Sequence, residues 1–263
     1  MSRYLLAFSY DGGSFHGYQI QPNATTVQSV LQDKLSLLVG SPLEIVGSSR
    51  TDTGVHAHQQ FAHFDLPSGK TVKENWVFRL NRMLPNSLAV QGIYQVADDF
   101  HARFAALSRT YEYRISPAKS PFNSAYAYRF GVELDVDAMN EATSLFFQHT
   151  DYQCFSKVKT EVATFECTIM QAYWAWRGEE LIFTIQGNRF LRGMVRAVVG
   201  TLLEVGQGRL NKTQLQEILD SKESEHLLFG DLTRPGTSFP LGARHPISIV
   251  KNRVLEIFSS ITK

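Results

Sequence analysis

The sequence has little cysteine, little net charge and no apolar run long enough to cross a membrane. Its two cysteines, Cys154 and Cys167, form no Cys-x-x-Cys pair, which excludes a zinc ribbon and a disulfide-stapled secreted scaffold. A reducing compartment is therefore expected. The N-terminus reaches the polar residues Ser9 and Asp11 too soon for a secretory signal peptide. Together with the missing apolar run, this predicts a cytoplasmic protein without a membrane segment.

The formal net charge of +1 at pH 7 results from 26 Lys and Arg residues against 25 Asp and Glu residues. A protein that attracts nucleic acid through its whole surface is strongly basic, and this one is not. Any RNA-binding surface is then a local patch of cations. The 263 residues, 43% of them hydrophobic, are enough for one large domain or two of moderate size.

A polar loop at residues 47–57 separates two stretches with strand character, residues 43–46 and 58–64. Asp52 is the only carboxylate in this loop. Arg50 stands two residues earlier, so in extended backbone both side chains point to the same side. A nearby cation keeps a carboxylate ionised, and a nucleophile or general base needs that charge.

The local chemistry of Asp52, Thr53 and Gly54 is also that of an ordinary turn, because Asp can bond its own backbone and Gly accepts positive φ. The whole stretch favours a catalytic interpretation instead. The run Arg50-Thr51-Asp52-Thr53-Gly54-Val55-His56-Ala57 closely resembles the Arg-Thr-Asp-(Ala/Thr)-Gly-Val-His-Ala signature of the TruA family of tRNA pseudouridine synthases.

Residues 1–104 form the first half of the chain. Their sequence pattern predicts the order strand, helix, strand, loop, strand, helix, strand. The strands are expected at 4–10, 43–46, 58–64 and 88–96. A capping box formed by Thr25 and Gln28 predicts a helix that ends near Gly40. An apolar stripe that begins at Val72 predicts a second helix, which ends before Pro85.

Residues 105–263 form the second half, with a similar order of elements. We expect strands at 110–115, 165–176, 180–186 and 247–258, with a turn around Gly178, and helices at 137–150, about 190–205 and 211–221. With the family resemblance, this predicts an α+β fold of two similar halves. Their mainly antiparallel sheets would join into one extended central sheet, with helices on the outer face and an active-site cleft between the halves.

Further segments resemble motifs of the same family. They are Phe15-His16-Gly17-Tyr18-Gln19-Ile20-Gln21, Phe100-His101-Ala102-Arg103-Phe104, the Arg-x-Tyr-x-Tyr run that contains Tyr111 and Tyr113, and Asn188-Arg189-Phe190-Leu191-Arg192-Gly193-Met194-Val195-Arg196. One segment departs from the family: Phe239-Pro240-Leu241-Gly242-Ala243 ends in Ala where Leu is expected.

The resemblance implies roles for several of these residues. Tyr111 is implied as the active-site tyrosine, Arg196 as the cation that pairs with the catalytic Asp52, and Arg50 as a further substrate-binding residue. Arg189 and Arg192, which cluster with Arg196 beside the apolar stripe of the helix at about 190–205, are implied to face RNA phosphate. Gln19 is a further candidate for RNA binding. Without the resemblance, half-buried strand tyrosines and a solvated basic helix face remain the ordinary interpretations.

The implied activity is conversion of uridine to pseudouridine at positions 38, 39 and 40 in the anticodon arm of tRNA. No cofactor and no metal are implied, and the partners are the tRNA and a second copy of the chain in a homodimer. Asp52 would be the nucleophile or base. Attack on the ribose C1′, addition to the base and a glycal route all remain open.

Three competing functions remain to be tested. Asp52-Thr53-Gly54 is also the catalytic triplet of aspartic proteases, but those need two such carboxylates and the chain has one copy. His56, His58 and His63 could hold a metal, although they lack the helical His-x-x-x-His spacing. The third alternative is an RNA-binding protein without catalytic activity.

Overall fold

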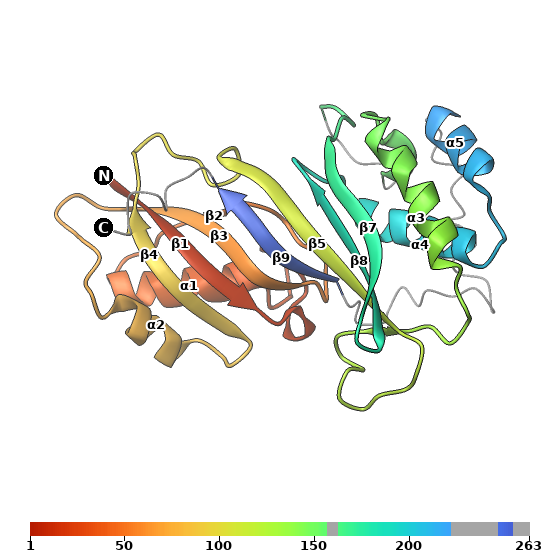
Figure 1. The fold of residues 1–263 in the computed structure, drawn as a ribbon. Coiled ribbons are helices and arrows are strands. Elements are labelled where there is room, and N and C mark those ends of the chain that lie inside the picture. The colour runs from red at the N-terminus through yellow and green to blue at the C-terminus, as the bar shows by residue number, and fades with distance from the viewer. Residues whose placement is uncertain (157–162, 222–246, 255–263) are drawn as a thin grey trace, which may run out of the picture. The chain divides into compact units, whose positions relative to one another are not determined.

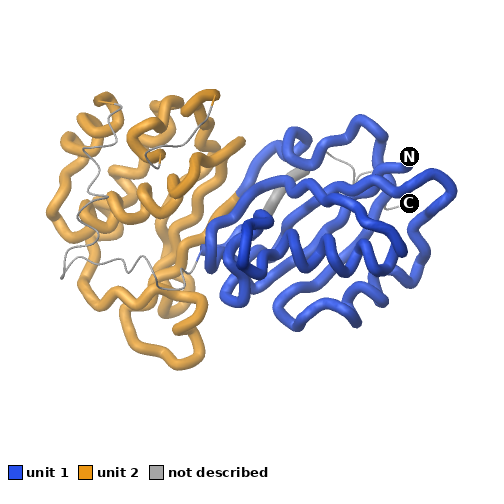
Figure 2. The backbone as a smooth tube through the Cα atoms, turned by 180° about the vertical axis from the view of Figure 1, so that it is seen from behind, with its two compact units in different colours: residues 1–109, 247–263 blue, residues 110–246 orange. Residues whose placement is uncertain are grey.

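The computed structural model describes residues 1–156, 163–221 and 247–254. In these ranges the fold is α+β, with nine strands in a mixed sheet and five α-helices (Figure 1). The chain forms two compact units (Figure 2). Unit 1 contains residues 1–109 and the strand β9 (Ile247–Val254), and unit 2 begins at residue 110. The expected division at residue 104 did not include this return of the chain to unit 1.

The sheet of unit 1 is built around β1 (Ser2–Tyr10) and β3 (His56–Leu66), which pair antiparallel. The strand β4 (Leu88–Gln95) pairs antiparallel with the other edge of β1, and the short β2 (Ile45–Gly47) pairs antiparallel with β3. All four strands expected in residues 1–104 are confirmed. The strand β9 lies parallel to β3, where it pairs with the two residues that follow the Asp52 loop.

Two helices cover one face of this sheet, α1 (Val27–Val39) and α2 (Trp76–Met83) (Figure 1). The N-cap of α1 is Thr26, whose side chain accepts from the Ser29 backbone N–H, so the expected Thr25–Gln28 box is wrong by one residue. The helix ends at Gly40 as predicted, and this glycine has φ +75°. The helix α2 begins at Trp76, four residues later than the apolar stripe suggested.

Unit 2 contains the strands β5 (Ala106–Ser116), β8 (Glu180–Gly187) and β7 (Ile169–Arg177), in this order across the sheet, and β5 begins in unit 1. The short β6 (Tyr128–Arg129) pairs parallel with β5. The predicted hairpin is confirmed: Arg177 pairs with Glu180, and Gly178 in the two-residue turn has φ +62°.

The helices of unit 2 are α3 (Val136–Thr143), α4 (Met194–Gly206) and α5 (Lys212–Ser221), and a 3-10 turn at Ser144–Phe147 extends α3. The helix α4 was expected to begin at about residue 190, which is wrong. Gly193 takes φ +77° just before it, so Arg189 and Arg192 lie in the preceding loop and only Arg196 lies on the helix. The atypical segment 239–243 lies outside the described residues. None of the described helices has the length and apolar character that a membrane span requires.

Candidate active site

Asp52 begins a tight turn between β2 and β3. Its backbone carbonyl accepts a hydrogen bond from the Val55 N–H at 3.2 Å, and Gly54 takes φ +80°. This confirms the turn that the local sequence predicted, and the Asp52 side chain is half-buried. Arg50 is exposed and forms no ion pair with Asp52, so the pairing that their spacing suggested is absent.

Buried polar side chains fix the residues that lead into this turn. Ser48 and Gln60 are fully buried, and the Ser48 hydroxyl donates to Gln60 Oε1 at 2.9 Å. The Gln60 amide nitrogen in turn donates to the Ser49 carbonyl at 3.1 Å. The hydroxyls of Thr51 and Tyr10 lie 2.8 Å apart. Since unmade hydrogen bonds are costly in the interior, these contacts favour one conformation of the loop.

The segment before α1 approaches the loop backbone closely at two glycines. A Cβ on Gly12 would lie 2.0 Å from the Val55 carbonyl oxygen, and one on Gly17, which has φ +86°, would lie 2.8 Å from the Thr51 carbonyl oxygen. The Tyr18 N–H donates to that Thr51 oxygen at 3.0 Å. Only glycine permits both approaches. Gln19, the next residue, is exposed, as a group that contacts RNA has to be.

Arg109 is a residue of this site that the sequence interpretation passed over. Its guanidinium is buried, and Nη2 donates to the carbonyl oxygen of Ser48 at 2.8 Å and to that of Arg103 at 3.2 Å. Arg109 is the first residue of the Arg-x-Tyr-x-Tyr motif, so the motif is the sequence signal that marks it. The guanidinium holds the start of β5 against the strand end that leads to Asp52.

In unit 2, β5 and the chain around the start of α4 bring the remaining candidates together. The buried Tyr111 ring meets the Phe190 ring edge-on, with the centroids 5.1 Å apart. Burial raises the pKa of Tyr113, and Tyr128 raises it further, while the Arg196 guanidinium acts in the opposite direction. Arg196 therefore lies near Tyr113.

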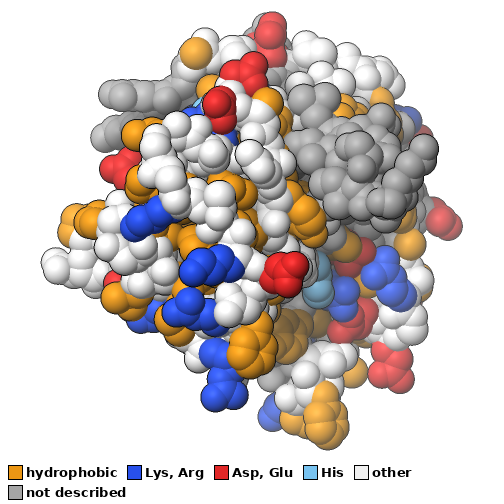
Figure 3. Space-filling model, turned by 90° about the vertical axis from the view of Figure 1, so that its left-hand side faces the viewer, with side chains coloured by type: hydrophobic (Ala, Val, Ile, Leu, Met, Phe, Trp, Pro, Cys, Tyr) orange, Lys and Arg blue, Asp and Glu red, His pale blue; other side chains and the backbone are white. Residues whose placement is uncertain are grey.

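Arg189 and Arg192 occupy the loop between β8 and α4, where Arg192 is exposed and Arg189 half-buried. Neither forms an ion pair with a described residue. On the face drawn in Figure 3, several Lys and Arg side chains lie near one another. The near-zero net charge is thus compatible with local cationic patches.

The histidines of the loop region have structural partners. His56 Nδ1 accepts from the Gly12 N–H at 3.1 Å and lies 2.8 Å from an Asp11 oxygen, and His63 Nδ1 accepts from the Ala102 N–H at 3.2 Å. His58 is exposed. Across the described ranges, no three His, Cys, Asp or Glu side chains lie close enough to hold a metal ion.

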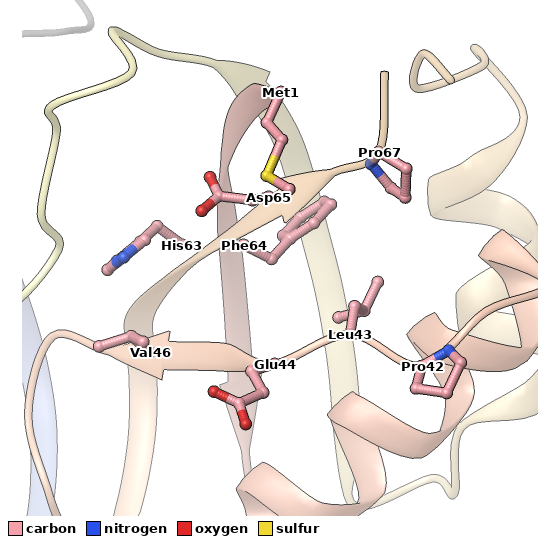
Figure 4. Close-up of a pocket in the computed structure, with 9 residues that line it drawn as sticks. All are labelled: Met1, Pro42, Leu43, Glu44, Val46, His63, Phe64, Asp65 and Pro67. Atoms are coloured by element: carbon pink, nitrogen blue, oxygen red, sulfur yellow. The ribbon is translucent and has the colours of Figure 1, made fainter. Parts of the chain in front are cut away.

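A hollow of about 230 Å³ lies near the other end of β3 (Figure 4). It is lined by Met1, Pro42, Leu43, Glu44, Val46, His63, Phe64, Asp65 and Pro67. At about 3.3 Å per strand residue, Phe64 lies roughly 26 Å along β3 from His56. The Asp65 carboxylate is already paired with Arg3 at 2.8 Å. This hollow is therefore separate from the Asp52 loop.

Comparison with known proteins identifies the family. A family model described as tRNA pseudouridine synthase matches residues 6–105 and 143–235. A protein of Parabacteroides distasonis is 44% identical over 252 residues, which cover 92% of this chain and 99% of that relative. A protein of Bacteroides thetaiotaomicron is 41% identical over 269 residues, which cover 100% and 95% of the two chains. A protein of Bacillus subtilis is 39% identical over 221 residues, which cover 82% and 89%.

The chain belongs to the tRNA pseudouridine synthase family and is an enzyme of the isomerase class. Each of these three relatives bears the name tRNA pseudouridine synthase A. This confirms the resemblance carried by residues 50–57.

Proposed function

We propose that this enzyme converts uridine to pseudouridine at positions 38, 39 and 40 in the anticodon stem-loop of tRNA, without a cofactor, and that Asp52 is its nucleophile. The observation that carries the proposal is the construction of the Asp52 loop. Its one carboxylate stands at a turn whose flanks are fixed by buried hydrogen bonds from Gln60, Tyr10 and Arg109. A catalytic group needs such a preorganised position.

The proposed reaction is an isomerisation in which no atom is gained from outside. The bond between uracil N1 and ribose C1′ breaks, the base turns, and C5 bonds to C1′. C5 then loses its proton to solvent, and N1 takes one up. An ionised Asp52 serves attack on C1′, addition to the base or abstraction of a ribose proton on a glycal route.

Residues of unit 2 complete the proposal. Tyr111 would stack on the extruded uracil, a contact worth roughly 1–3 kcal/mol, and its hydroxyl would relay the C5 proton to solvent, giving up its own proton as it takes that one. Arg196 would pair with Asp52 and keep it ionised. The edge-on contact of Tyr111 with Phe190 supports its role, because it fixes the ring plane.

The remaining cations and Gln19 are proposed to position the RNA. Arg189 and Arg192 lack ion pairs among the described residues, which leaves their guanidiniums available for phosphates. Arg50, exposed beside the turn, would contact the substrate nucleotides. The proposal also includes a homodimer that acts on one tRNA in the cytoplasm.

The experiment is tritium release from tRNA that carries [5-³H]uridine, with the modified positions then mapped in unlabelled tRNA. Stoichiometric release at positions 38–40 is the expected result. A chain that binds tRNA without release would instead be an RNA-binding protein. A metal chelator is added in parallel, and inhibition of release would favour the metal alternative. Pepstatin-sensitive cleavage of a protein substrate, measured separately, would favour the protease alternative.

A further inference from the structure

The segment Phe100-His101-Ala102-Arg103-Phe104 leaves an aromatic ring and a guanidinium in solvent. Ala102, Ala105 and Ala106 of this region are buried against Leu5, Ala7 and Phe61 on the sheet of unit 1. Phe104, by contrast, is 77% exposed, and Arg103 is exposed beside it. A single exposed phenyl ring is ordinary on a protein surface, so its contacts and its neighbours have to show whether it has a function.

The exposed ring has a fixed position. The Phe104 ring lies 4.4 Å from the His101 ring, and the His101 ring lies 4.8 Å from that of the buried His63. The N–H groups of Phe104 and Ala105 both donate to the His101 carbonyl, at 3.0 and 2.9 Å. The Arg103 guanidinium carbon lies 5.9 Å from the centre of the Phe104 ring. We call Arg103 and Phe104 the 103–104 shelf.

The shelf lies beside the loop that carries Asp52. One nitrogen atom, Nη2 of Arg109, bonds the carbonyl oxygen of Arg103 and also that of Ser48. Ser48 stands four residues before Asp52. Both carbonyls therefore contact the same buried group, and this fixes the shelf relative to the candidate active site within unit 1.

We propose that the 103–104 shelf is a second contact for the RNA substrate, where Phe104 stacks on an unpaired base and Arg103 contacts a phosphate. This inference rests on the proposed function. A fixed aromatic face beside a cation is the usual combination for unpaired RNA, whose bases are free to stack. Arg103 forms no ion pair with a described residue, so its charge complements a phosphate.

A protein partner fits the shelf less well. The nearest exposed apolar residue in sequence is Leu107, at 46% exposure, and two side chains give far less apolar area than a stable protein interface contains. The occupant to which we commit is therefore a nucleotide of the tRNA other than the target uridine.

The test compares Phe104→Ala with Phe104→Trp, and uses Phe78→Ala as the matched control. Phe78 is 68% exposed on the outer side of α2, away from any role assigned above. We expect Phe104→Ala to raise the Kd for tRNA about 5- to 150-fold, as loss of one stacked base predicts, while single-turnover release at saturating enzyme stays within a few-fold. The Trp variant and the control should bind like the parent.

Arg103→Gln tests the phosphate contact. Its expected effect is a decrease of about 0.7–0.9 in the slope of log Kd against log salt concentration, with Arg79→Gln on α2 unchanged. Melting temperatures should not move for any of these exposed positions. Parent-like binding by Phe104→Ala, or conversion of an oligomer to a monomer by that change, overturns the proposal.

These outcomes separate the shelf from the proposed function. If the parent enzyme releases no tritium but its tRNA affinity depends on Phe104, the proposed activity fails and the shelf stands. If the parent is active and Phe104→Ala binds equally well, only the shelf fails.

Discussion

Arg109 donates a hydrogen bond to the carbonyl oxygen of Ser48 at 2.8 Å, across 61 residues of sequence. Replacement by Ala leaves this buried carbonyl and that of Arg103 without their donor, which should cost about 3 kcal/mol of stability and loosen the Asp52 loop. Urea unfolding and single-turnover tritium release measure the two effects. Arg109→Lys keeps one donor and should fall between the parent and Arg109→Ala. If Arg109→Ala unfolded at the same urea concentration as the parent and released tritium at the same rate, these hydrogen bonds would contribute neither to stability nor to activity.

Asp52→Asn removes the charge at constant size. In the proposed mechanism turnover falls below detection, while tRNA affinity and melting temperature stay close to those of the parent, since the side chain is half-buried and forms no ion pair with a described residue. Tritium release and a binding titration on the same preparation check this. Substantial turnover by the Asn variant would rule out Asp52 as the nucleophile.

Gly12→Ala introduces a methyl group 2.0 Å from the Val55 carbonyl oxygen, so the backbone of the Asp52 turn has to move. The expected cost is about 2–3 kcal/mol in unfolding free energy, with a parallel loss of turnover. Gly131→Ala is the matched control, because the nearest atom to its new methyl group is the Pro117 oxygen at 3.6 Å. Equal stability of the two variants would contradict the close approach.

His63 should make stability depend on pH. Burial lowers its pKa from 6.5 to about 4, with smaller contributions from Arg3 and His101. Between these values the unfolded chain binds a proton that the folded chain does not, so stability falls as the pH drops from 6.5 to 4. The Arg3 guanidinium lowers the pKa of Asp65 from 3.8, so the loss due to Asp65 lies below this window.

Unfolding free energies measured between pH 7 and 4 test this dependence. His63→Gln can keep an acceptor for the Ala102 N–H but does not titrate, so its pH profile should be flatter than that of the parent. If the unfolding free energies of the parent and of His63→Gln changed equally with pH, His63 would not be the cause of the dependence.

The two thiols should be inert in the folded enzyme. Burial raises the pKa of Cys154 to about 12 and that of Cys167 to about 11, and the thiolate is the reactive form. At pH 8 an aromatic disulfide reagent should label neither cysteine in the native protein and both in guanidinium chloride. Rapid labelling of the native protein would contradict this prediction, because it would mean that the two thiols are accessible to the reagent in the folded enzyme.

The sequence predicted best what depends on local periodicity and turn chemistry. The order of strands and helices in residues 1–104, the Gly40 helix end and the Asp52 turn all follow from side chains within a few residues of each other. The predicted bounds were wrong where adjacent residues offer two choices. Thr25 and Thr26 are both good N-caps, and the structure uses Thr26. The apolar pattern already includes Phe190 and Leu191, but α4 begins only after Gly193.

Contacts between distant parts of the chain were beyond this reasoning. Nothing near Arg109 in sequence indicates that it binds Ser48, and the spacing of Arg50 and Asp52 suggested a pairing that the structure does not contain. Sequence spacing gives the direction of a side chain only when the backbone conformation is known.

The pairing of β9 with His56 and Ala57 has a consequence for biosynthesis. The ribosome makes the Asp52 loop first, and the strand β9 that pairs with the start of β3 is translated almost two hundred residues later. Until residue 249 has left the exit tunnel, this edge of β3 stays open in the nascent chain and accessible to chaperones. This flank of the Asp52 loop is therefore completed only after Ser248 and Ile249 have been made.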